Sequence, residues 1–365
     1  MNKLKNKLFL KLFLIFAFSV TFSLSAQTTD LKIDHFIPNV PVNDISSDGQ
    51  NIWFATNGRG VFKYNISGNK WKNYSTENKK LKIDFFYCIT SNGKYVWAGS
   101  TDGLFIFNIK RKRWSRRKFG KGGQLGNWIR SVKFDPYQNV VWIGRFQFLT
   151  KYDIKKHKYK DYDLRINGNE KTNNIKSLYV DGDSLLWVGT EGGVHKIWKK
   201  HKMDKNRTYI FYDNSMNYFN AEGDEVSVSS ILGERKYLWF GTDEFITQQN
   251  PNFNLGGLFR YDRKDQWIKF DVSNSLLGNG IFSLERTGDY IWASTYEFNQ
   301  NKKEADGRGI VLVNRITLKI KPIVLENVPN DIYKIFFDGK YVWLGTISGV
   351  YRIKLVNNLI PTFNN

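Results

Sequence analysis

The stretch Tyr341-Val342-Trp343-Leu344-Gly345-Thr346 is the last of seven copies of one short phrase. Each copy has a tryptophan, a small residue two places later and, in most copies, Thr or Ser next. The tryptophans are Trp53, Trp97, Trp142, Trp187, Trp239, Trp292 and Trp343. Successive copies lie 44, 45, 45, 52, 53 and 51 residues apart. A period of about 40–50 residues with strand-like content is typical of a β-propeller, in which each copy is one four-stranded blade.

The last copy shows what one blade contains. Residues 330–337 form a strand-like run, Asp338-Gly339 makes a tight turn, and residues 341–346 and 350–353 are the second and third strands. These runs are apolar on both faces, as expected for a sheet that lies between two other sheets. The small residue shares the face of its tryptophan because strand side chains alternate. We therefore expect it to make room for a bulky side chain of the adjoining blade.

The two ends of the repeat region predict how the ring closes. Six copies are followed by a fourth, outer strand, but the seventh is not. Residues 31–37 match the outer-strand pattern and precede the first copy. The sequence therefore predicts an all-β, seven-bladed β-propeller in which residues 31–37 complete the last blade. Closure would remove two unpaired strand edges.

The first 26 residues have the pattern of a signal peptide. Four lysines precede an apolar run over residues 12–20, and Ser25-Ala26 before Gln27 offers small residues for cleavage. No later run has the 18 or so apolar residues of a membrane span. Cys88 is the only cysteine, so neither a disulfide nor a lipid-modified cysteine at the cleavage point is expected. We predict a signal peptide over 1–26, one propeller over 27–357, a tail over 358–365, and a periplasmic or secreted monomer.

The chain is strongly basic, with a formal net charge of +21. Three equivalent turns of blades two, three and four carry much of this charge, and we call them the basic rim. Its members are Lys110, Arg111, Lys112, Arg113, Lys155, Lys156, Lys158, Lys199, Lys200 and Lys202. Such a surface suits an acidic glycan, lipopolysaccharide or an acidic protein face, and nucleic acid is not expected for an exported protein. The alternative is that these charges are solvated and keep a strand edge from aggregating.

The repeats resemble the two-component regulator propeller repeat. The pattern reads Asp48-Gly49, Trp53, Thr56, Gly60-Val61 and Tyr64 in the first copy, and it recurs from Asp338 to Tyr351 in the last. The resemblance covers roughly residues 31–355. It implies a relationship to the periplasmic sensor regions of bacterial hybrid histidine kinases, many of which respond to glycan fragments. The chain shows no kinase or receiver segment, so ligand or partner binding is the property that the resemblance implies here.

Long loops on one face of the ring predict where a ligand binds. Residues 243–256 and 296–307 read as insertions between second and third strands, and 164–173 and 214–224 as long connections between blades. Their aromatic and polar side chains suit stacking on sugar rings together with hydrogen bonding. The candidates on these loops are Tyr218, Asn220, Glu244, Phe245, Tyr296 and Glu297. Alternatively, the loops only pack on one another.

Blade three departs from the repeat, with Arg145-Phe146 where the other copies have Thr or Ser. Arg145 at a strand end could clamp a carboxylate or sulfate, or pair with an acidic residue of the next blade. Trp128 stands at the first position of the inner strand. Glu225 and Asp331 occupy the same position in blades five and seven. We expect these three residues to lie around the channel mouth. The acids there are too scattered to predict a metal site.

Catalytic motifs are not apparent in the sequence. We find no nucleophile elbow, zinc motif or phosphate loop, the four histidines do not cluster, and no cofactor is expected. The favoured interpretation is a non-enzymatic, exported propeller that binds a glycan fragment or an envelope protein. A polysaccharide lyase or glycan-cleaving enzyme, with acids among Glu225, Glu244, Glu297 and Asp331, is the alternative. A structural scaffold in an envelope complex is the third.

Overall fold

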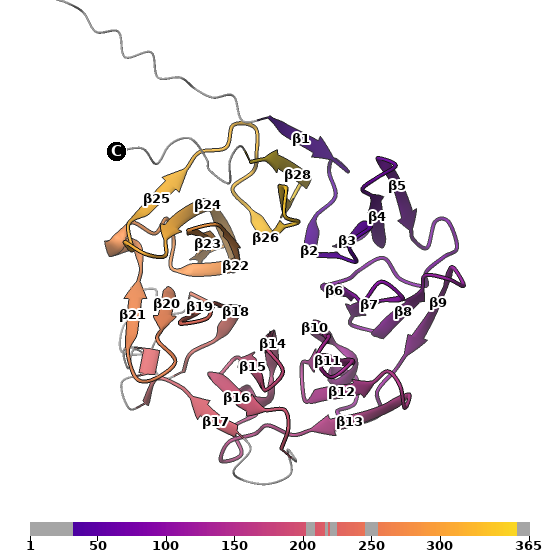
Figure 1. The fold of residues 1–365 in the computed structure, drawn as a ribbon, viewed down its shortest axis with the longest axis horizontal. Helices are drawn as coiled ribbons and strands as arrows, with labels where there is room; N and C mark the ends of the chain where they lie inside the picture. Colours follow the sequence, from indigo (N-terminus) through magenta and orange to yellow (C-terminus); the bar gives the residue numbers. More distant parts are fainter. Residues whose placement is uncertain (1–31, 202–208, 216–217, 220–224, 245–254, 356–365) are drawn as a thin grey trace, which may run out of the picture. The chain divides into compact units, whose positions relative to one another are not determined.

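Seven four-stranded antiparallel sheets surround a central channel in the computed structural model (Figure 1). The structure describes residues 32–201, 209–215, 218–219, 225–244 and 255–355. Over these residues the chain is all-β apart from short 3-10 segments, which include Leu125–Asn127 (η1), Glu170–Asn173 (η2) and Val272–Asn274 (η4). The predicted seven-bladed propeller is confirmed. The described residues include no helix long and apolar enough to cross a membrane.

Each blade runs from an inner strand at the channel to an outer strand at the rim. Blade one consists of β2 (Val42–Ser47), β3 (Asn51–Thr56), β4 (Val61–Asn65) and β5 (Lys70–Tyr74). Blade two consists of β6 (Cys88–Ser91), β7 (Tyr95–Ser100), β8 (Gly103–Asn108) and β9 (Arg113–Arg117). Blades three and four are β10 (Ile129–Asp135), β11 (Val140–Arg145), β12 (Leu149–Asp153), β13 (Lys158–Tyr162) and β14 (Ile175–Asp181), β15 (Leu185–Thr190), β16 (Val194–Trp198), β17 (Tyr209–Tyr212). Blades five and six are β18 (Val228–Gly233), β19 (Leu238–Thr242), β20 (Leu258–Tyr261), β21 (Trp267–Phe270) and β22 (Gly280–Thr287), β23 (Tyr290–Asn299), β24 (Glu304–Asn314), β25 (Ile320–Ile323). Blade seven is β26 (Ile332–Phe337), β27 (Tyr341–Thr346), β28 (Gly349–Lys354) and β1 (Ile33–Phe36).

The second strand of each blade forms most of the core. It is almost completely buried in six blades, and so are residues 290–296 of β23 in blade six, because a neighbouring sheet covers each of its faces. The seven repeat tryptophans are among the largest fully buried side chains. Their burial explains why these strands are apolar on both faces.

The small residue of the repeat allows adjacent blades to approach closely. A Cβ atom added at Gly144 would lie 2.5 Å from Cγ2 of Ile175, and one at Gly241 would lie 2.5 Å from Cγ2 of Ile281. Ile175 and Ile281 each lie at the start of the next blade's inner strand. The predicted role of the small residue, which is to make room for a bulky neighbour, is therefore confirmed.

The N-terminal strand closes the ring. β1 pairs antiparallel with β28, from Ile33 opposite Ile353 to Phe36 opposite Val350 (Figure 1). Asp34 of β1 forms an ion pair with Arg352 of β28 at 2.6 Å. Both edges of the last blade's third strand are thus paired, as the sequence predicted.

One predicted loop is instead a β-hairpin. Residues 296–307 lie between the second and third strands of blade six, as predicted, but β23 and β24 continue through them with Tyr296 opposite Gly307 and Asn299 opposite Glu304. The insertion is paired rather than a loop because alternating side chains over this stretch let the ladder extend beyond the blade. The paired extension carries Tyr296 and Phe298 toward the channel mouth.

Candidate ligand-binding site

One residue per blade lines the channel mouth, and a β-bulge selects it. In six blades the ladder between the first and second strands skips one residue near the start of the inner strand. An unpaired bulge residue is re-aimed relative to its neighbours. The skipped residues are Asn43, Arg130, Lys176, Ser229, Phe282 and Tyr333. Tyr87 holds this place in blade two, and all seven line the same cavity.

The sequence placed the mouth residues two to four positions too early. Glu225 and Asp331 do not line the cavity. Glu225 contacts Lys171 and accepts a hydrogen bond from Asn169 at 3.0 Å, whereas Asp331 accepts one from the backbone N–H of Gly307 at 2.9 Å. Both carboxylates therefore join neighbouring loops. The bulge, which the repeat pattern does not display directly, caused the error.

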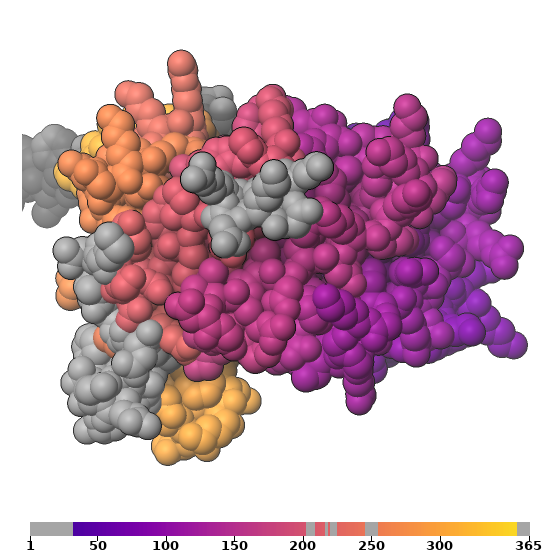
Figure 2. All heavy atoms as spheres, turned by 90° about the horizontal axis from the view of Figure 1, so that it is seen from below, coloured from indigo at the N-terminus to yellow at the C-terminus, as the bar shows by residue number. Residues whose placement is uncertain are grey.

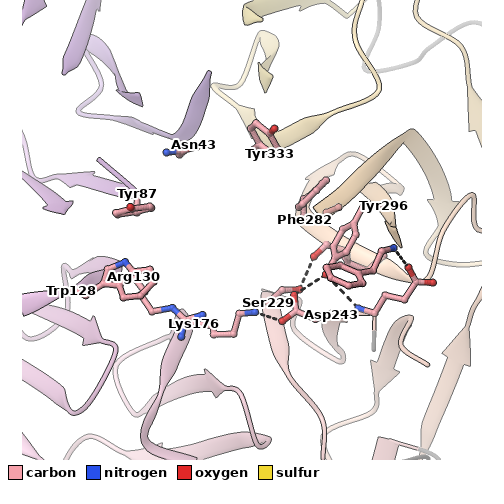
Figure 3. A pocket seen from close by; sticks show the side chains of 14 residues that line it. Asn43, Tyr87, Trp128, Arg130, Lys176, Ser229, Asp243, Phe282, Tyr296 and Tyr333 are labelled. Atoms are coloured by element: carbon pink, nitrogen blue, oxygen red, sulfur yellow. Dashed lines mark hydrogen bonds and ion pairs between the residues drawn. The ribbon is translucent and has the colours of Figure 1, made fainter. Parts of the chain in front are cut away.

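The mouth cavity has a volume of about 620 Å³ and an aromatic wall on the side of blades two and three (Figure 3). Trp128 stacks on Phe146 with ring centroids 5.2 Å apart and planes within 13°. The ring of Tyr87 lies 5.9 Å from that of Trp128. The guanidinium of Arg130 lies 5.3 Å from the Phe146 ring and pairs with Glu191 at 2.6 Å. These contacts hold Trp128 in place. Trp128, which was predicted from the sequence, lines the cavity.

A second aromatic wall stands across the channel, on blades six and seven (Figure 3). Phe282 stacks on Tyr296 at 4.3 Å and meets Tyr333 edge-on at 5.3 Å. Tyr296 was predicted from its loop, whereas Phe282 and Tyr333 were missed. The available signal was their position, directly before the residue that pairs with the small residue of each repeat.

Between the walls, Asp243 is the centre of a polar network (Figure 3). It forms an ion pair with Lys176 and accepts hydrogen bonds from Ser227 Oγ at 2.5 Å and Tyr296 Oη at 3.0 Å. Burial opposes ionisation of Asp243, but the Lys176 ammonium and these donors hold its pKa below the usual value. Burial and the charge of Asp243 raise the pKa of Tyr296 well above its usual value. The network therefore joins an ionised carboxylate and a protonated phenol beside Lys176.

Glu244, also a predicted site residue, lines the cavity beside this network. Its carboxylate accepts a hydrogen bond from the backbone N–H of Phe298, and its own N–H donates to Tyr296 Oη at 3.3 Å. These two bonds tie the end of β19 to the hairpin of blade six. The side chain thus has a structural contact as well as a place in the cavity wall.

The channel below the mouth contains charges of both signs, in a cavity of about 340 Å³. Lys334 pairs with Asp44 at 3.1 Å. Burial, and then the charge of Lys334, lower the pKa of Lys133, while burial raises the pKa of Glu285. The channel interior is therefore polar, but its charges lie beside opposite charges.

Arg145 is not a ligand clamp. Its side chain is 0% exposed and pairs with Asp161 at 3.0 Å. It also donates to the carbonyl oxygens of Lys121 and Gly126, each at 3.0 Å, and its guanidinium lies 4.8 Å from the Phe119 ring. The acid that neutralises it belongs to β13 of the same blade, not to the next blade as the alternative prediction had it. Phe146, the next residue, contributes by supporting Trp128.

Two other loop candidates, Tyr218 and Glu297, do not line the mouth cavity. Tyr218 packs on Tyr212 and Trp267 at ring distances of 4.9 and 6.1 Å, within the core between blades four and five. Glu297 pairs with Arg308 on the hairpin of blade six. Asn220 and Phe245 lie outside the described residues.

The basic rim is an exposed surface over blades two and three. Lys110–Arg113, Lys155, Lys156 and Lys158 are exposed. Figure 2 shows the outer edge of these blades, purple to magenta, with several side chains projecting from it. Lys200 is also exposed and pairs with Asp183 at 2.6 Å, and Lys202 lies outside the described residues.

Lys199 corrects the prediction for the rim in blade four. Its ammonium pairs with Asp135 at 2.7 Å, and neither side chain is exposed. Asp135 also accepts the indole N–H of Trp142 at 3.2 Å. Lys199 is therefore an internal link between blades three and four, because a buried carboxylate needs a counter-charge.

Within the described part of the chain, no group of three His, Cys, Asp or Glu side chains could hold a metal ion. The single cysteine, Cys88, is free and buried, and burial raises the pKa of its thiol. The arrangement at the mouth is instead suited to enclosing a ligand between two aromatic walls.

Comparison with known proteins supports the repeat assignment. Residues 169–192 match the family model described as two component regulator propeller. The resemblance seen in the sequence is confirmed. This two-component regulator propeller repeat spans η2, β14 and β15 and includes Trp187. A search of curated proteins found no match.

Solved structures share the fold of these repeats. The extracellular domain of BT4673 from B. thetaiotaomicron, named a one component system in one crystal structure and a hybrid two component system in another, has a TM-score of 0.66 in the first at 20% identity. The alignment covers 88% of this chain and 39% of that one, so this chain spans about two fifths of the BT4673 domain. Virginiamycin B lyase from Staphylococcus aureus has a TM-score of 0.65 at 13% identity, over 90% of this chain and 100% of that one. At these identities the likeness shows the fold alone.

Proposed function

We propose that this protein is a binding module that takes a glycan fragment into the mouth cavity. The observation that carries the proposal is the pair of facing aromatic walls, Tyr87 with Trp128 and Phe282 with Tyr296, around a cavity of about 620 Å³. Ligand sites are commonly concave, largely apolar and about 300–1,000 Å³ in volume, with a few polar groups that fix orientation. Aromatic faces suit the C–H faces of sugar rings, and the polar network between them suits hydroxyl groups.

The charges at the mouth favour an uncharged fragment. Arg130 is paired with Glu191, and Lys176 is paired with Asp243. An acidic sugar would have to displace one of these internal carboxylates. We therefore infer that neutral oligosaccharides bind more tightly than uronic-acid polymers, and a protein partner is the competing outcome.

The same contacts support binding rather than turnover. A general acid needs a raised pKa, but the pKa of Asp243 is lowered by Lys176 and its hydrogen-bond donors. The raised pKa of Tyr296 makes that phenol a poor base. The lyase named above shares the propeller fold at 13% identity. A glycan-cleaving activity is thus the alternative, for which the cavity's acids would have to leave their present partners.

The proposal includes export to the periplasm or the exterior. Its support is the leader-like pattern of residues 1–26, which lie outside the described residues. The mass of the protein recovered from expressing cells tests this part. Cleavage before Gln27 is the expected result, and an intact N-terminus on the mature protein would contradict it.

The decisive experiment is a glycan array followed by titration calorimetry with the best oligosaccharide. Trp128→Ala should weaken binding about tenfold or more, since aromatic anchors dominate binding energy. Tyr137→Ala is the matched control, because Tyr137 is 62% exposed on the turn at the other end of β10. Equal affinity of both variants would refute the site, and release of product from any acidic polysaccharide would replace binding with catalysis.

A further inference from the structure

The repeat tryptophans share an internal acceptor for their indole N–H groups. In six blades the acceptor is the side chain of the last residue of the first strand or of the residue directly after it. The bonds are Trp53 to Asp48 (2.8 Å), Trp142 to Asp135 (3.2 Å), Trp187 to Asp181 (3.0 Å), Trp239 to Glu234 (2.6 Å), Trp292 to Thr287 (2.7 Å) and Trp343 to Asp338 (2.7 Å). Buried N–H groups need such acceptors, and five of the six are carboxylates.

A cation accompanies each of these carboxylates. In the five blades with an acidic acceptor, the residue directly opposite the tryptophan on the third strand is Lys or Arg. Its charged group lies 5.1–5.9 Å from the indole ring. Blade six replaces both partners with neutral residues, Thr287 and Leu312. Acid and cation therefore occur together or not at all.

Blade two lacks both charges and also lacks the acceptor. Asn92 stands where blades one and seven have Asp, and Ile106 lies opposite Trp97. The Asn92 side-chain oxygen accepts the backbone N–H groups of Lys94 (3.0 Å) and Tyr95 (2.8 Å). The other end of this side chain is an amide NH₂, which donates. The Trp97 side chain is 0% exposed, and its N–H has no partner among the described residues.

A cleft lies beside this tryptophan, between blades two and three. Its volume is about 460 Å³, and Trp97 and Ile106 form part of its wall. Tyr152 and His157 contribute from blade three, and Arg111 and Arg113 from the basic rim. No carboxylate lines the cleft, and neither arginine forms an ion pair with any described residue. The cleft is consequently rich in donors and positive charge.

We propose that this cleft binds a small organic carboxylate. The ligand accepts the indole N–H of Trp97, a bond that a side chain of the protein accepts in the other six blades. The ligand displaces the Asn92 side chain, so that its carboxylate oxygens accept the Trp97 indole N–H where most other blades have an aspartate, and Arg111 and Arg113 provide the counter-charge. The body of the ligand occupies the space that Lys63 fills in blade one, between the Trp97 face and Tyr152. This site is separate from the mouth cavity and does not depend on the function proposed there.

The test uses ¹⁵N-labelled protein and benzoate as the probe, with benzamide as its neutral counterpart. The indole N–H signal of Trp97 is assigned by its loss in Trp97→Phe. Benzoate should shift this signal saturably, because its carboxylate accepts a hydrogen bond, and benzamide should not. An equal shift with benzamide, or no saturable shift with benzoate, would overturn the proposal.

Two variants distinguish the site from general attraction to a basic surface. Asn92→Asp rebuilds the internal acceptor of blades one and seven, and should lower benzoate affinity about tenfold or more. Arg111→Gln with Arg113→Gln should do the same by removing the counter-charge. Lys94→Gln is the control, since this exposed lysine of the same blade does not line the cleft. Unchanged affinity in Asn92→Asp, or equal loss in Lys94→Gln, would refute the assignment.

Discussion

The close approach of Gly144 to the next blade provides a quantitative test of how this ring is packed. An alanine at position 144 would place its Cβ 2.5 Å from Cγ2 and 3.0 Å from Cβ of Ile175. Real Cβ atoms do not approach this closely, so one blade must shift. Overpacking of this kind costs about 1–3 kcal/mol. We expect Gly144→Ala to lower the free energy of unfolding by that amount.

A double-mutant cycle isolates the contact. Ile175→Ala alone should cost about 2–5 kcal/mol by leaving a cavity. Because it also removes the Cγ2 atom that meets the new methyl group, the double variant should be more stable than the sum of the two losses by about 0.5–3 kcal/mol. Gly120→Ala is the matched control, since no atom lies within 4 Å of a Cβ added there.

Equilibrium unfolding in urea, followed by tryptophan fluorescence, measures these differences as midpoints at constant slope. The 12 tryptophans make the signal strong. Equal stability of Gly144→Ala and Gly120→Ala would refute the claim that this glycine exists for blade contact. Strict additivity in the cycle would show that Ile175 is not the residue that it accommodates.

Two further predictions concern buried titratable groups. His195 is fully buried and hydrogen-bonded to the carbonyl oxygen of Thr172, and burial lowers its pKa to about 4 from 6.5. Between these two pH values the unfolded chain binds a proton that the folded chain does not. The free energy of unfolding should therefore fall by about 1–3 kcal/mol as the pH decreases from 6.5 to 4. The urea midpoint of His195→Phe should change less over this range, and an equal change in the variant and the unmodified protein would contradict the assignment. Lys199→Ala leaves Asp135 buried without its counter-charge and should lower the free energy of unfolding by about 3–5 kcal/mol. Lys155→Ala, at an exposed position, should change it by no more than about 0.5 kcal/mol. Thermal unfolding of the two variants measures the difference, and similar midpoints would indicate that Lys199 is exposed like the rest of the basic rim.

Several site residues could be predicted because their signals are local. Trp128, Glu244 and Tyr296 stand next to features that the repeat pattern makes visible, and all three line the mouth cavity. Phe282 and Tyr333 could have been found by counting one residue back from the partner of the repeat's small residue. No comparable signal exists for charge pairing between distant segments.

Arg145 and Lys199 illustrate that second class. Both look like surface charges in the sequence, and both are buried beside carboxylates, Asp161 and Asp135. The carboxylate of Asp135 lies 64 positions from Lys199 along the chain. Arg145 meets an acid of its own blade, whereas the acid that Lys199 meets depends on the angle between adjacent blades, and composition does not record that angle.

The sequence by itself determined the number of blades, their order and the closure of the ring by residues 31–37. This was possible because every blade packs against its neighbours with a buried tryptophan and a small residue two positions later, and the sevenfold recurrence of this pattern is visible in the sequence. Only the tertiary structure decided which residues face the channel, since a single-residue bulge in six of the seven inner strands turns one side chain inward. It also brought Trp128 and Phe282 to opposite sides of one cavity, because ring closure places blades three and six across the channel from each other (Figures 1 and 3).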